Sequence, residues 1–481
     1  MINFNITWRS EAKIPLYQQL YEQVKDKIRS GQIPAGEKLP SRRKLASLLG
    51  LSLNTVETAF EQLHAEGYIR AIPQSGSYVC KLQSPLQIAP LTASIPADQD
   101  IPPPPEEQAA CPFDLSTNQV DTSSFPFKTW SRTIKAVMQD HSQTMLQLAH
   151  PQGDFSLRQS LADYLHAFRG VNCQPDQIII GAGTEYLLGL IVQLLGRNKR
   201  YAVENPGYRR ISQIIKSNGA TVRPIGLDAD GIAVSQLEES KAEIVYVTPS
   251  HHFPTGIIMP VSRRNQLLRW ASQSGRRYII EDDYDSEFRF QGRPVPALQG
   301  LDSCNRVIYI GTFSKSLAPS IRISYLVLPM QLLAVYRQTL GFYSCTVSRF
   351  EQIILHRFMA DGHFEKHLNR MRLVYRERKD ALIKSIEQSP YSHQIEVIGE
   401  NAGLHLMLRI GNSLAESELI RRAQAQGIKV HGLSEYYSDG ADKHKNAGSS
   451  TAGTVVIGYA NYRPQQIEAC VECLLKAWFN G

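Results

Sequence analysis

Six short apolar runs between residues 178 and 328 constrain the fold of this chain more than any other feature. The runs are IIIG at 178, YAVE at 201, EIVYVTP at 243, RYIIEDD at 277, VIYIGT at 307 and ISYLVL at 323. Stretches of helical character separate them, and such alternation predicts a parallel or largely parallel sheet covered by helices. Ligands of such sheets bind beyond the carboxyl ends of the strands, so the polar residues that follow the runs are the candidates for a site.

Length and composition indicate a soluble protein with more than one domain. A chain of 481 residues exceeds one ordinary core, and 42% hydrophobic with 20% charged residues is typical of globular proteins. No apolar run approaches the ~20 residues of a membrane-spanning helix. The start MINFNITWRSEAK has no signal-peptide pattern, so we expect a cytoplasmic protein with no membrane partner. The formal charge of +7 permits an acidic partner without identifying one.

The seven cysteines favour reduced thiols, because they are scattered and odd in number in a long chain with no secretion signal. Cys470 and Cys473 form a single CxxC, yet no second Cys or His pair follows and IEACVECLLKAWF has helical spacing. We interpret them as two thiols on a helix face and expect no metal site.

The first eighty residues have the pattern of a winged helix-turn-helix. Leu16, Leu20, Val24 and Ile28 form the apolar stripe of a first helix that stops at Gly31. LPSRRKLASLLG and LSLNTVETAFEQLHAEG predict two further helices, each with a serine as N-cap and a glycine at its end. YIRAIPQSGSYVC then predicts two short strands around a turn, so this unit is α+β and mostly helical.

Polar residues at the starts of the second and third helices, and in the hairpin, are the predicted DNA contacts. One helix of such a unit enters the major groove while basic and hydroxyl groups bind phosphates, and a helix N-terminus also attracts phosphate. The predicted contacts are Arg42, Arg43, Lys44, Ser52, Asn54, Thr55, Ser75 and Ser77. The helical pattern alone also fits a protein-interaction module of similar shape.

A proline-rich segment separates this unit from the rest of the chain. Four consecutive prolines stand at 102 to 105, and no helical or strand period survives around them, which favours extended polyproline II. A long loop within one domain is the less favoured alternative, because such loops are uncommon in compact folds. We predict a winged helix at residues 1–81, a linker at 82–112 and an α/β domain at 113–481.

Three motifs of the large domain lie at predicted strand ends, and each is ambiguous alone. GAGTEYLLGL can hold a phosphate at the N–H groups around Gly183 and Thr184, although glycine turns are often structural. EDDYDSEF places Asp282 and Tyr284 on one side of an extended segment, where acids also bind magnesium or cap helices. GTFSKSLAPSIRISY places Lys315 beyond a strand, where a lysine can also be merely solvated.

Together the motifs supply what an aldehyde cofactor on a pyridine ring requires. Such a cofactor needs an amine that bonds to the aldehyde, a carboxylate that keeps the ring nitrogen protonated, a phenol near the ring oxygen and donors for a phosphate. Lys315, Asp282 and Tyr284 supply the first three. The phosphate donors at these strand ends are Gly183, Thr184, Thr312, Ser314 and Arg322.

These motifs resemble known families over most of the chain. LPSRRKLA, TVETAFEQLHAEGYI and SGSYV resemble the DNA-binding domain of the GntR family over residues 13 to 80, although Leu53 stands where that family often has an arginine. NPGYRR, TPSHHFPTG, EDDYDSEF and GTFSKSLAPSIRISY resemble fold-type I aminotransferases, which use pyridoxal 5′-phosphate (PLP), over residues 113 to 480. With the linker, the whole chain resembles the MocR/GabR family of bacterial transcription regulators.

The resemblance implies roles for individual residues. It implies that Lys315 bonds covalently to PLP, that Asp282 pairs with the ring nitrogen and that Tyr284 contacts the ring oxygen O3′. Tyr208 of NPGY then stacks on the ring, the five phosphate donors named above hold the phosphate, and Arg210 contacts an effector. The resemblance also implies a double-stranded DNA operator and a homodimer in which the winged helix of one subunit can reach over its partner.

Two departures from the family pattern bear on function. FPTG at 253 stands where aminotransferases have Asn-Pro-Thr-Gly, so the amide contact to O3′ is absent or is replaced by one from His252. Glu435 of GLSEYY stands where family members that bind carboxylate-bearing amines carry an arginine. A buried carboxylate there repels the carboxylate of an amino acid instead of clamping it.

Three functions are compatible with these patterns. The favoured one is a regulator that senses PLP itself, which resembles the PdxR subgroup that controls vitamin B6 synthesis, because the carboxylate anchor is missing. The second is a regulator whose PLP reacts with an amine, D-amino-acid or peptide effector, as in the GABA-responsive members. The third, a working aminotransferase, is disfavoured because no clear arginine positions a substrate, so we expect no catalytic residues.

Overall fold

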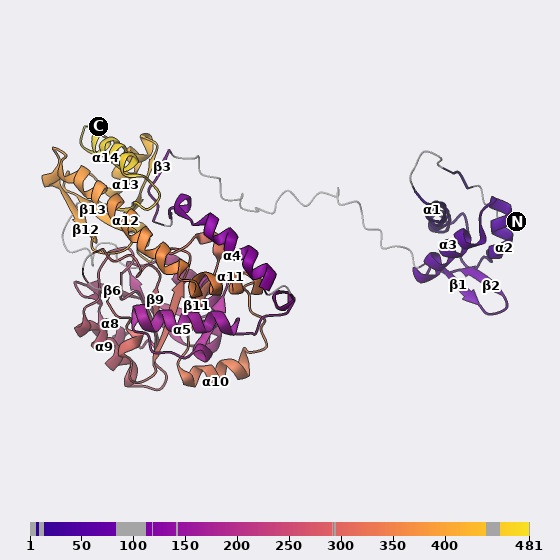
Figure 1. The fold of residues 1–481 in the computed structure, drawn as a ribbon, viewed down its shortest axis with the longest axis horizontal. Coiled ribbons are helices and arrows are strands. Elements are labelled where there is room, and N and C mark those ends of the chain that lie inside the picture. Colours follow the sequence, from indigo (N-terminus) through magenta and orange to yellow (C-terminus); the bar gives the residue numbers. More distant parts are fainter. Residues whose placement is uncertain are drawn as a thin grey trace. The chain divides into compact units, whose positions relative to one another are not determined.

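The structure is a computed structural model that describes residues 6–8, 14–82, 112–117, 119–140, 143–290, 292, 295–438 and 453–480. The chain divides into two compact units, Met1–Glu107 and Gln108–Gly481 (Figure 1). The predicted linker at 82–112 lies outside the described residues except at its two ends. Within the described ranges, no helix is both long enough and apolar enough to span a membrane.

The first unit is a winged helix-turn-helix, as the sequence predicts. It contains α1 (Leu16–Arg29), α2 (Arg42–Leu49) and α3 (Leu53–Ala65), followed by the hairpin of β1 (Ile69–Ile72) and β2 (Gly76–Val79). The Ser41 and Ser52 hydroxyls accept the N–H groups of Lys44 and Thr55 at 3.3 and 3.1 Å, so both predicted caps form. Gly50 ends α2 at φ 63°, a left-handed conformation that lets α3 start at once.

The second unit is built on an eight-stranded sheet of order β4-β11-β10-β9-β8-β5-β6-β7. The strands are β4 (Ile178–Gly181), β5 (Arg200–Asn205), β6 (Thr221–Asp228), β7 (Gly231–Ile232), β8 (Ile244–Val247), β9 (Tyr278–Asp283), β10 (Val307–Thr312) and β11 (Ser324–Val327). Five neighbouring strands pair in parallel, in the order β10, β9, β8, β5 and β6, so their carboxyl ends share one edge of the sheet. β11 runs antiparallel to β10 and β4, which brings the residues before it to the same edge.

Helices cover both faces of this sheet, as strands that are apolar along their length require. Ile179 packs with α6 (Thr184–Leu195), and α7 (Arg209–Ser217) and α10 (Met330–Thr339) lie on the same face. Ile178 and Ile180 face the opposite way, toward α5 (Phe155–Arg169) and α11 (Arg349–Ala360). α8 (Val234–Glu239) and α9 (Val261–Ser272) cover the rest of that second face.

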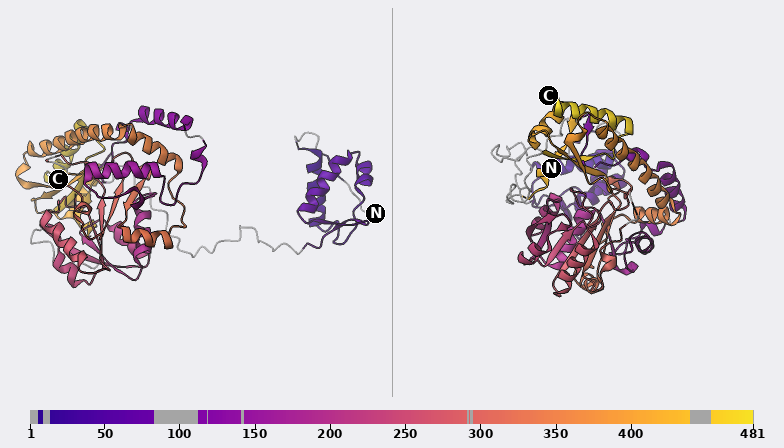
Figure 2. Two further views of the ribbon diagram at one scale, coloured as in Figure 1. Left: turned by 60° about the horizontal axis from the view of Figure 1, so that its bottom comes forward. Right: turned by 90° about the vertical axis from the view of Figure 1, so that its left-hand side faces the viewer.

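A smaller sheet of order β12-β13-β16-β15 forms the C-terminal part of the unit. Its strands are β12 (Ile395–Ile398), β13 (His405–Ile410), β15 (His431–Gly432) and β16 (Gly453–Gly458), and β3 (Phe113–Asp114) pairs with β14 (Ile428–Lys429). α12 (His363–Glu387), α13 (Glu416–Ala425) and α14 (Pro464–Phe479) pack with this sheet, while α4 (Phe127–Asp140) lies against α11 (Figures 1 and 2). Cys470 and Cys473 are free thiols on α14, the first buried and the second exposed.

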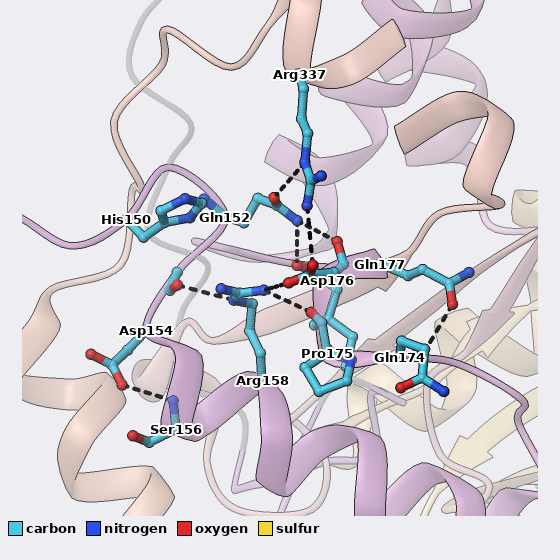
Figure 3. A network of polar contacts seen from close by, with 12 residues as sticks. His150, Gln152, Asp154, Ser156, Arg158, Gln174, Pro175, Asp176, Gln177 and Arg337 are labelled. Atoms are coloured by element: carbon cyan, nitrogen blue, oxygen red, sulfur yellow. Dashed lines mark hydrogen bonds and ion pairs between the residues drawn. The ribbon is translucent and has the colours of Figure 1, made fainter. Parts of the chain in front are cut away.

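A polar network fixes the loop that leads into α5 (Figure 3). The Gln152 amide donates to the Asp176 carbonyl at 2.7 Å and accepts from Arg337 at 3.3 Å. Arg158 is 4% exposed and donates to the carbonyls of Gly153 and Pro175 at 3.1 and 2.8 Å. This loop is therefore held firmly against the start of β4.

Candidate cofactor site and DNA-binding face

A cavity of about 440 Å³ lies at the carboxyl edge of the eight-stranded sheet. Nine of the twelve residues predicted for cofactor or effector binding line it: Thr184, Tyr208, Arg210, Asp282, Tyr284, Thr312, Ser314, Lys315 and Arg322. Four different strand ends supply these residues, so the fold brings together motifs that are up to 138 positions apart, from Thr184 to Arg322.

Lys315 stands half-buried in the cavity wall, just beyond β10. Its ammonium donates to the carbonyl oxygen of Thr117 at 2.8 Å. Burial lowers the pKa of Lys315 from 10.5 to about 8, and the Asp285 carboxylate opposes that shift. A much larger share of the neutral amine is then present near neutral pH, and the neutral amine is the form that bonds to an aldehyde.

Asp282 is 8% exposed, and only one of its two carboxylate oxygens accepts a hydrogen bond among the described residues. Tyr246 donates a hydrogen bond to Oδ2, while Oδ1 is buried with no hydrogen-bond partner among the described residues. Burial raises the pKa of Asp282 to about 7; the Tyr246 hydrogen bond lowers it, and Asp283 and Asp285 raise it further. An unpartnered buried acceptor costs about 1–3 kcal/mol, so this oxygen is suited to a cationic N–H donor in the cavity.

Aromatic side chains form the walls beside these two groups. The Tyr208 and Phe253 rings meet edge to face at 5.6 Å between centroids, and Phe253 and Tyr284 do so at 6.3 Å. All three residues line the cavity. Such walls suit a flat ring that is held between the lysine and the carboxylate.

One end of the cavity is arranged as an anion cradle. Gly183 has φ 98°, a backbone conformation that glycine adopts without strain, and the guanidinium of Arg322 lies close to it. Thr312 donates to Ser314 at 3.0 Å beside the N-terminus of α6. Arg322 pairs with Glu185 at 2.9 Å. Backbone N–H groups, hydroxyls and a guanidinium at a helix start are the groups that bind phosphate.

His252 and Glu435 do not lie where the sequence placed them. His252 is 2% exposed behind the cavity wall, with Nδ1 at 2.7 Å from the Thr255 hydroxyl, and burial lowers its pKa to about 3. The cis Phe253–Pro254 bond follows, and it is Phe253 that faces the cavity. Glu435 is exposed instead of buried. Its carboxylate lies 2.8 Å from Nδ1 of His431 and accepts the Gly432 N–H at 3.1 Å, which holds it outside the cavity wall.

Three further residues at the cavity were missed. Tyr246 precedes Asp282 by 36 positions, and only the parallel pairing of β8 with β9, in which Tyr246 lies beside Ile280, places both on one face. Glu204 is 7% exposed and accepts from the Thr248 N–H and hydroxyl at 3.0 and 2.9 Å; burial raises its pKa to about 8. Thr117 meets Lys315 through a backbone oxygen, for which a sequence carries no local signal.

The predicted DNA contacts lie at the starts of α2 and α3 and in the hairpin. Arg43, Lys44, Ser52 and Asn54 are exposed, whereas Arg42, Thr55, Ser75 and Ser77 are half-buried. Arg42 lies 3.9 Å from Glu57, and the Ser75 hydroxyl is engaged by Tyr78 at 2.6 Å. Of the basic contacts, Arg43 and Lys44 are thus the most accessible to phosphate.

We expect Arg43→Ala to weaken binding to every DNA sequence by a similar factor. A phosphate contact releases a bound counterion, so losing one contact reduces the salt slope of log K by about 0.9. Fluorescence anisotropy over a series of salt concentrations measures both quantities. Lys476→Ala on α14 is the matched control, because this exposed residue pairs only with Glu472 in its own helix. An unchanged affinity and slope for Arg43→Ala would show that α2 does not face the backbone.

Comparison with known families agrees with this arrangement. Residues 112–446 match the aminotransferase class I and II family, and residues 16–79 match the bacterial regulatory proteins of the gntR family. The solved kynurenine aminotransferase of Pyrococcus horikoshii superposes with a TM-score of 0.65 at 24% identity, over 77% of this chain and 91% of that chain. The second unit therefore has the fold-type I aminotransferase fold.

Several relatives match both units. The chain is 39% identical over 465 residues to the uncharacterized HTH-type transcriptional regulator YdeL of Bacillus subtilis, covering 97% of each chain. It is 32% identical over 480 residues to the probable rhizopine catabolism regulatory protein MocR of Rhizobium meliloti, covering 97% and 94%. It is 30% identical over 428 residues to the HTH-type pyridoxine biosynthesis transcriptional regulator PdxR of Corynebacterium glutamicum, covering 88% and 89%.

Fold, cavity and relatives together define a transcription regulator in which a DNA-binding winged helix is joined to an aminotransferase-like domain. The chain belongs to the MocR/GabR family. PLP is the cofactor that this family and fold imply, and the cavity fits it. The desolvated Lys315 amine, the open oxygen of Asp282 and the glycine at 183 that makes room for Arg322 match its aldehyde, ring nitrogen and phosphate.

We expect the PLP-free protein to lose stability between pH 6.5 and 8. Burial raises the pKa of Glu204 to about 8 and those of Glu281, Asp282 and Glu287 to about 7. The folded chain then holds protons that the unfolded chain has lost, so stability falls as the pH rises through these values, by up to about 1.4 kcal/mol per acid and pH unit. Buried histidines such as His252, with a pKa lowered to about 3, cost stability only below pH 6.5.

Thermal unfolding at fixed ionic strength measures this pH dependence. Glu204→Gln removes one of the titrating acids and should flatten the slope. Glu418→Gln on α13 should not, because hydrogen bonds from Arg421 and Arg422 lower the pKa of Glu418 to about 2, far below this pH range. A midpoint that stays constant or rises from pH 6.5 to 8 would contradict the raised pKa values.

Proposed function

We propose that this regulator senses PLP itself and controls genes of vitamin B6 (PLP) synthesis. The observation that carries the proposal is the cavity, which offers a partner for each polar part of PLP within a chain that also has a DNA-binding unit. The relative PdxR, named for pyridoxine biosynthesis, supports the choice of target genes. The protein would act in the cytoplasm, where its DNA lies.

Each cavity residue has one task in this proposal. Lys315 holds PLP covalently, Asp282 holds a proton on the ring nitrogen, Tyr284 contacts O3′ and Tyr208 lies against the ring. Gly183, Thr184, Thr312, Ser314 and Arg322 bind the phosphate. When bound, PLP supplies an aldehyde that takes up amines and a ring that absorbs visible light.

We propose that the large domain works as a sensor and has no catalytic residues. An aminotransferase must position the carboxylate of its substrate for each turnover. Arg210, the predicted effector contact, lies 3.4 Å from Glu185, which also binds Arg322. Glu435 is exposed and bound to His431, so it neither repels nor clamps a ligand in the cavity. Both features favour regulation over turnover.

We also propose a homodimer. Leu146, Leu148 and Phe342 are 77%, 88% and 77% exposed, unusual values for large apolar side chains. The first two lie at the loop that the network of Figure 3 anchors, and Phe342 precedes Thr346, whose hydroxyl accepts the Ala182 N–H at 2.9 Å. Both segments thus expose large apolar side chains on the surface of the second unit. Light scattering should give twice the 54.0 kDa chain mass; the mass of one chain would contradict the proposal.

Titration of the PLP-free protein with PLP, while binding to promoter DNA of PLP synthesis genes is followed, tests the proposed function. PLP alone should change the affinity for this DNA in the same concentration range in which the visible absorbance develops. Pyridoxine, which has no aldehyde and no phosphate, is the matched control ligand. An unchanged DNA affinity at PLP saturation would refute PLP sensing.

A second candidate is a regulator whose bound PLP responds to an amine, D-amino acid or peptide. The relative MocR, named for rhizopine catabolism, is more similar to this chain than PdxR, and Arg209 and Arg210 line the cavity at the start of α7. In this case PLP alone leaves DNA affinity unchanged, and adding amines to the PLP-loaded protein changes it. The same titration therefore separates the two candidates.

A further inference from the structure

A buried histidine and aspartate lie directly behind Tyr284 at the cavity wall. His251 and Asp285 are each 2% exposed. Nδ1 of His251 lies 2.9 Å from Oδ2 of Asp285 and 3.1 Å from the phenol oxygen of Tyr284. One ring nitrogen thus faces both a carboxylate and the phenol that we assign to O3′ of the cofactor. Neither His251 nor Asp285 was singled out in the sequence.

The surroundings of the ring decide which nitrogen carries its proton. Asp285 is a buried carboxylate, which accepts hydrogen bonds and gives none while it is ionised, so it favours a proton on Nδ1. Nε2 of His251 is buried and has no hydrogen-bond partner among the described residues. A proton on Nε2 would be a buried donor without an acceptor, whereas a bare nitrogen there costs less. Both ends of the ring therefore favour the same neutral tautomer.

This tautomer determines the direction of the Tyr284 hydrogen bond. An Nδ1–H group can be shared between Oδ2 of Asp285 and the Tyr284 oxygen, but it cannot accept the phenol proton. We infer that Asp285 and His251 are positioning residues that fix the His251 proton on Nδ1 and so turn the Tyr284 hydroxyl into the cavity as a donor. Burial and the nearby carboxylates raise the pKa of Tyr284 well above 10, which keeps this donor protonated.

A metal site is the competing role for the pair. His405 stacks near His251 at 4.9 Å between centroids, and its Nε2 donates to the Pro254 carbonyl at 3.1 Å. His251, Asp285 and His405 each offer one nitrogen or oxygen atom, and these three atoms lie within 4.8 Å of one another, which is close enough for a metal site. A Cβ at Gly403 would lie 1.9 Å from Cε1 of His251, so the ring is closely packed. A metal ion that used Nδ1 of His251 or Nε2 of His405 would displace the hydrogen bonds that these atoms make.

Charged groups on the surrounding elements shape the pH dependence as well. Tyr284 faces Asp282, Asp283 and Glu204 in addition to Asp285. Lys315, His252 and His405 also act on the pair. Replacing Asp285 removes a charge that acts directly on Lys315. Changes at His251 leave all these charges in place, so His251 is the sharper position for a test.

The spectral test compares His251→Phe, which removes the nitrogen, with His251→Asn, whose amide N–H replaces Nδ1. A donor to the negative ring oxygen O3′ weakens that oxygen's hold on the proton of the nearby lysine nitrogen. Loss of this donor should raise the pH at which the visible spectrum of the PLP-loaded protein is half changed, the midpoint, by about one unit. Tyr284→Phe should raise the midpoint at least as much, the double variant His251→Phe/Tyr284→Phe no further, and His251→Asn should restore most of the shift.

A second measurement uses the full chain without PLP. ¹⁵N spectra of histidine-labelled protein distinguish a protonated Nδ1 from a protonated Nε2, and the His251 signal is the one missing from His251→Asn. We expect a proton on Nδ1 in the native protein and a mixture of tautomers in Asp285→Asn. Elemental analysis of the same sample reports any bound metal ion.

The outcomes separate this inference from the proposed function, on which its spectral part rests. A native protein that stays colourless with PLP defeats the proposed function, and the ¹⁵N spectra then decide the inference alone. A coloured protein whose midpoint moves in Tyr284→Phe but not in His251→Phe overturns the inference. So does a proton on Nε2, or one equivalent of metal that is lost in His251→Phe.

Discussion

Lys315→Ala is expected to abolish the visible absorbance that PLP gives with the native protein, and to make DNA binding independent of PLP. Lys315 is the one lysine among the described residues that line the cavity. Burial lowers the pKa of its amine to about 8. Without this amine PLP keeps only its ring and phosphate contacts, so the sensor loses its covalent link.

The fold should survive this change, because the substitution removes a partly desolvated cation that donates a hydrogen bond to the Thr117 carbonyl. Absorbance after gel filtration measures bound PLP, and anisotropy with and without PLP measures the coupling to DNA. Lys384→Ala, on the exposed side of α12, is the matched control and should retain both the colour and the response. Persistent colour in Lys315→Ala would place the covalent bond elsewhere.

Local signals in the sequence were sufficient to predict the winged helix. Ser41, Ser52 and Gly50 act within a few residues of where they stand, so caps and turns can be read directly from the chain. The apolar runs also predicted six of the eight strands of the large sheet, because a strand that is buried on both faces must be apolar along its length. β6 and β7 at one edge of the sheet were not predicted. The smaller C-terminal sheet was not predicted as a separate layer.

The cofactor site was predictable where its residues follow strand ends. Thr184, Asp282 and Lys315 meet in one cavity because parallel strands share an edge. Tyr246 and His405 were missed, since one depends on strand pairing and the other enters from the smaller sheet. At the FPTG motif it is Phe253 that lines the cavity, whereas His252 is buried beside the cavity-lining Glu204, and the sequence carries no signal for this difference.

The site also contains a concentration of acids that no motif explains. Glu281, Asp282, Asp283, Asp285 and Glu287 are all buried within one short segment. Asp283 is neutralised by Arg169 at 2.8 Å, and Asp285 bonds to His251. Glu281 accepts two backbone N–H groups, at 2.7 and 2.8 Å. Of these five acids, Asp282 is the one that lines the cavity and also keeps a buried oxygen without a partner among the described residues, so a cation bound there relieves a cost that the empty protein carries.

Asp282→Asn is therefore expected to weaken PLP binding by about 10- to 100-fold, since a hydrogen bond to a charged group contributes about 1.5–3 kcal/mol. Asparagine keeps the volume of the side chain but cannot stabilise a protonated ring nitrogen by charge. Equilibrium titration followed by visible absorbance measures the change, and the PLP concentration that alters DNA binding should move by the same factor.

The PLP-free Asp282→Asn protein provides the internal control for folding. Because the variant removes a buried acid whose pKa is raised to about 7, its unfolding midpoint at pH 8 should equal or exceed that of the native protein. Tyr246→Phe keeps the carboxylate and removes its phenol donor, so it should weaken PLP binding less than Asp282→Asn does. Equal PLP affinity in native protein and Asp282→Asn would mean that the ring nitrogen is not held at this carboxylate, and the orientation proposed for PLP in the cavity would then be wrong.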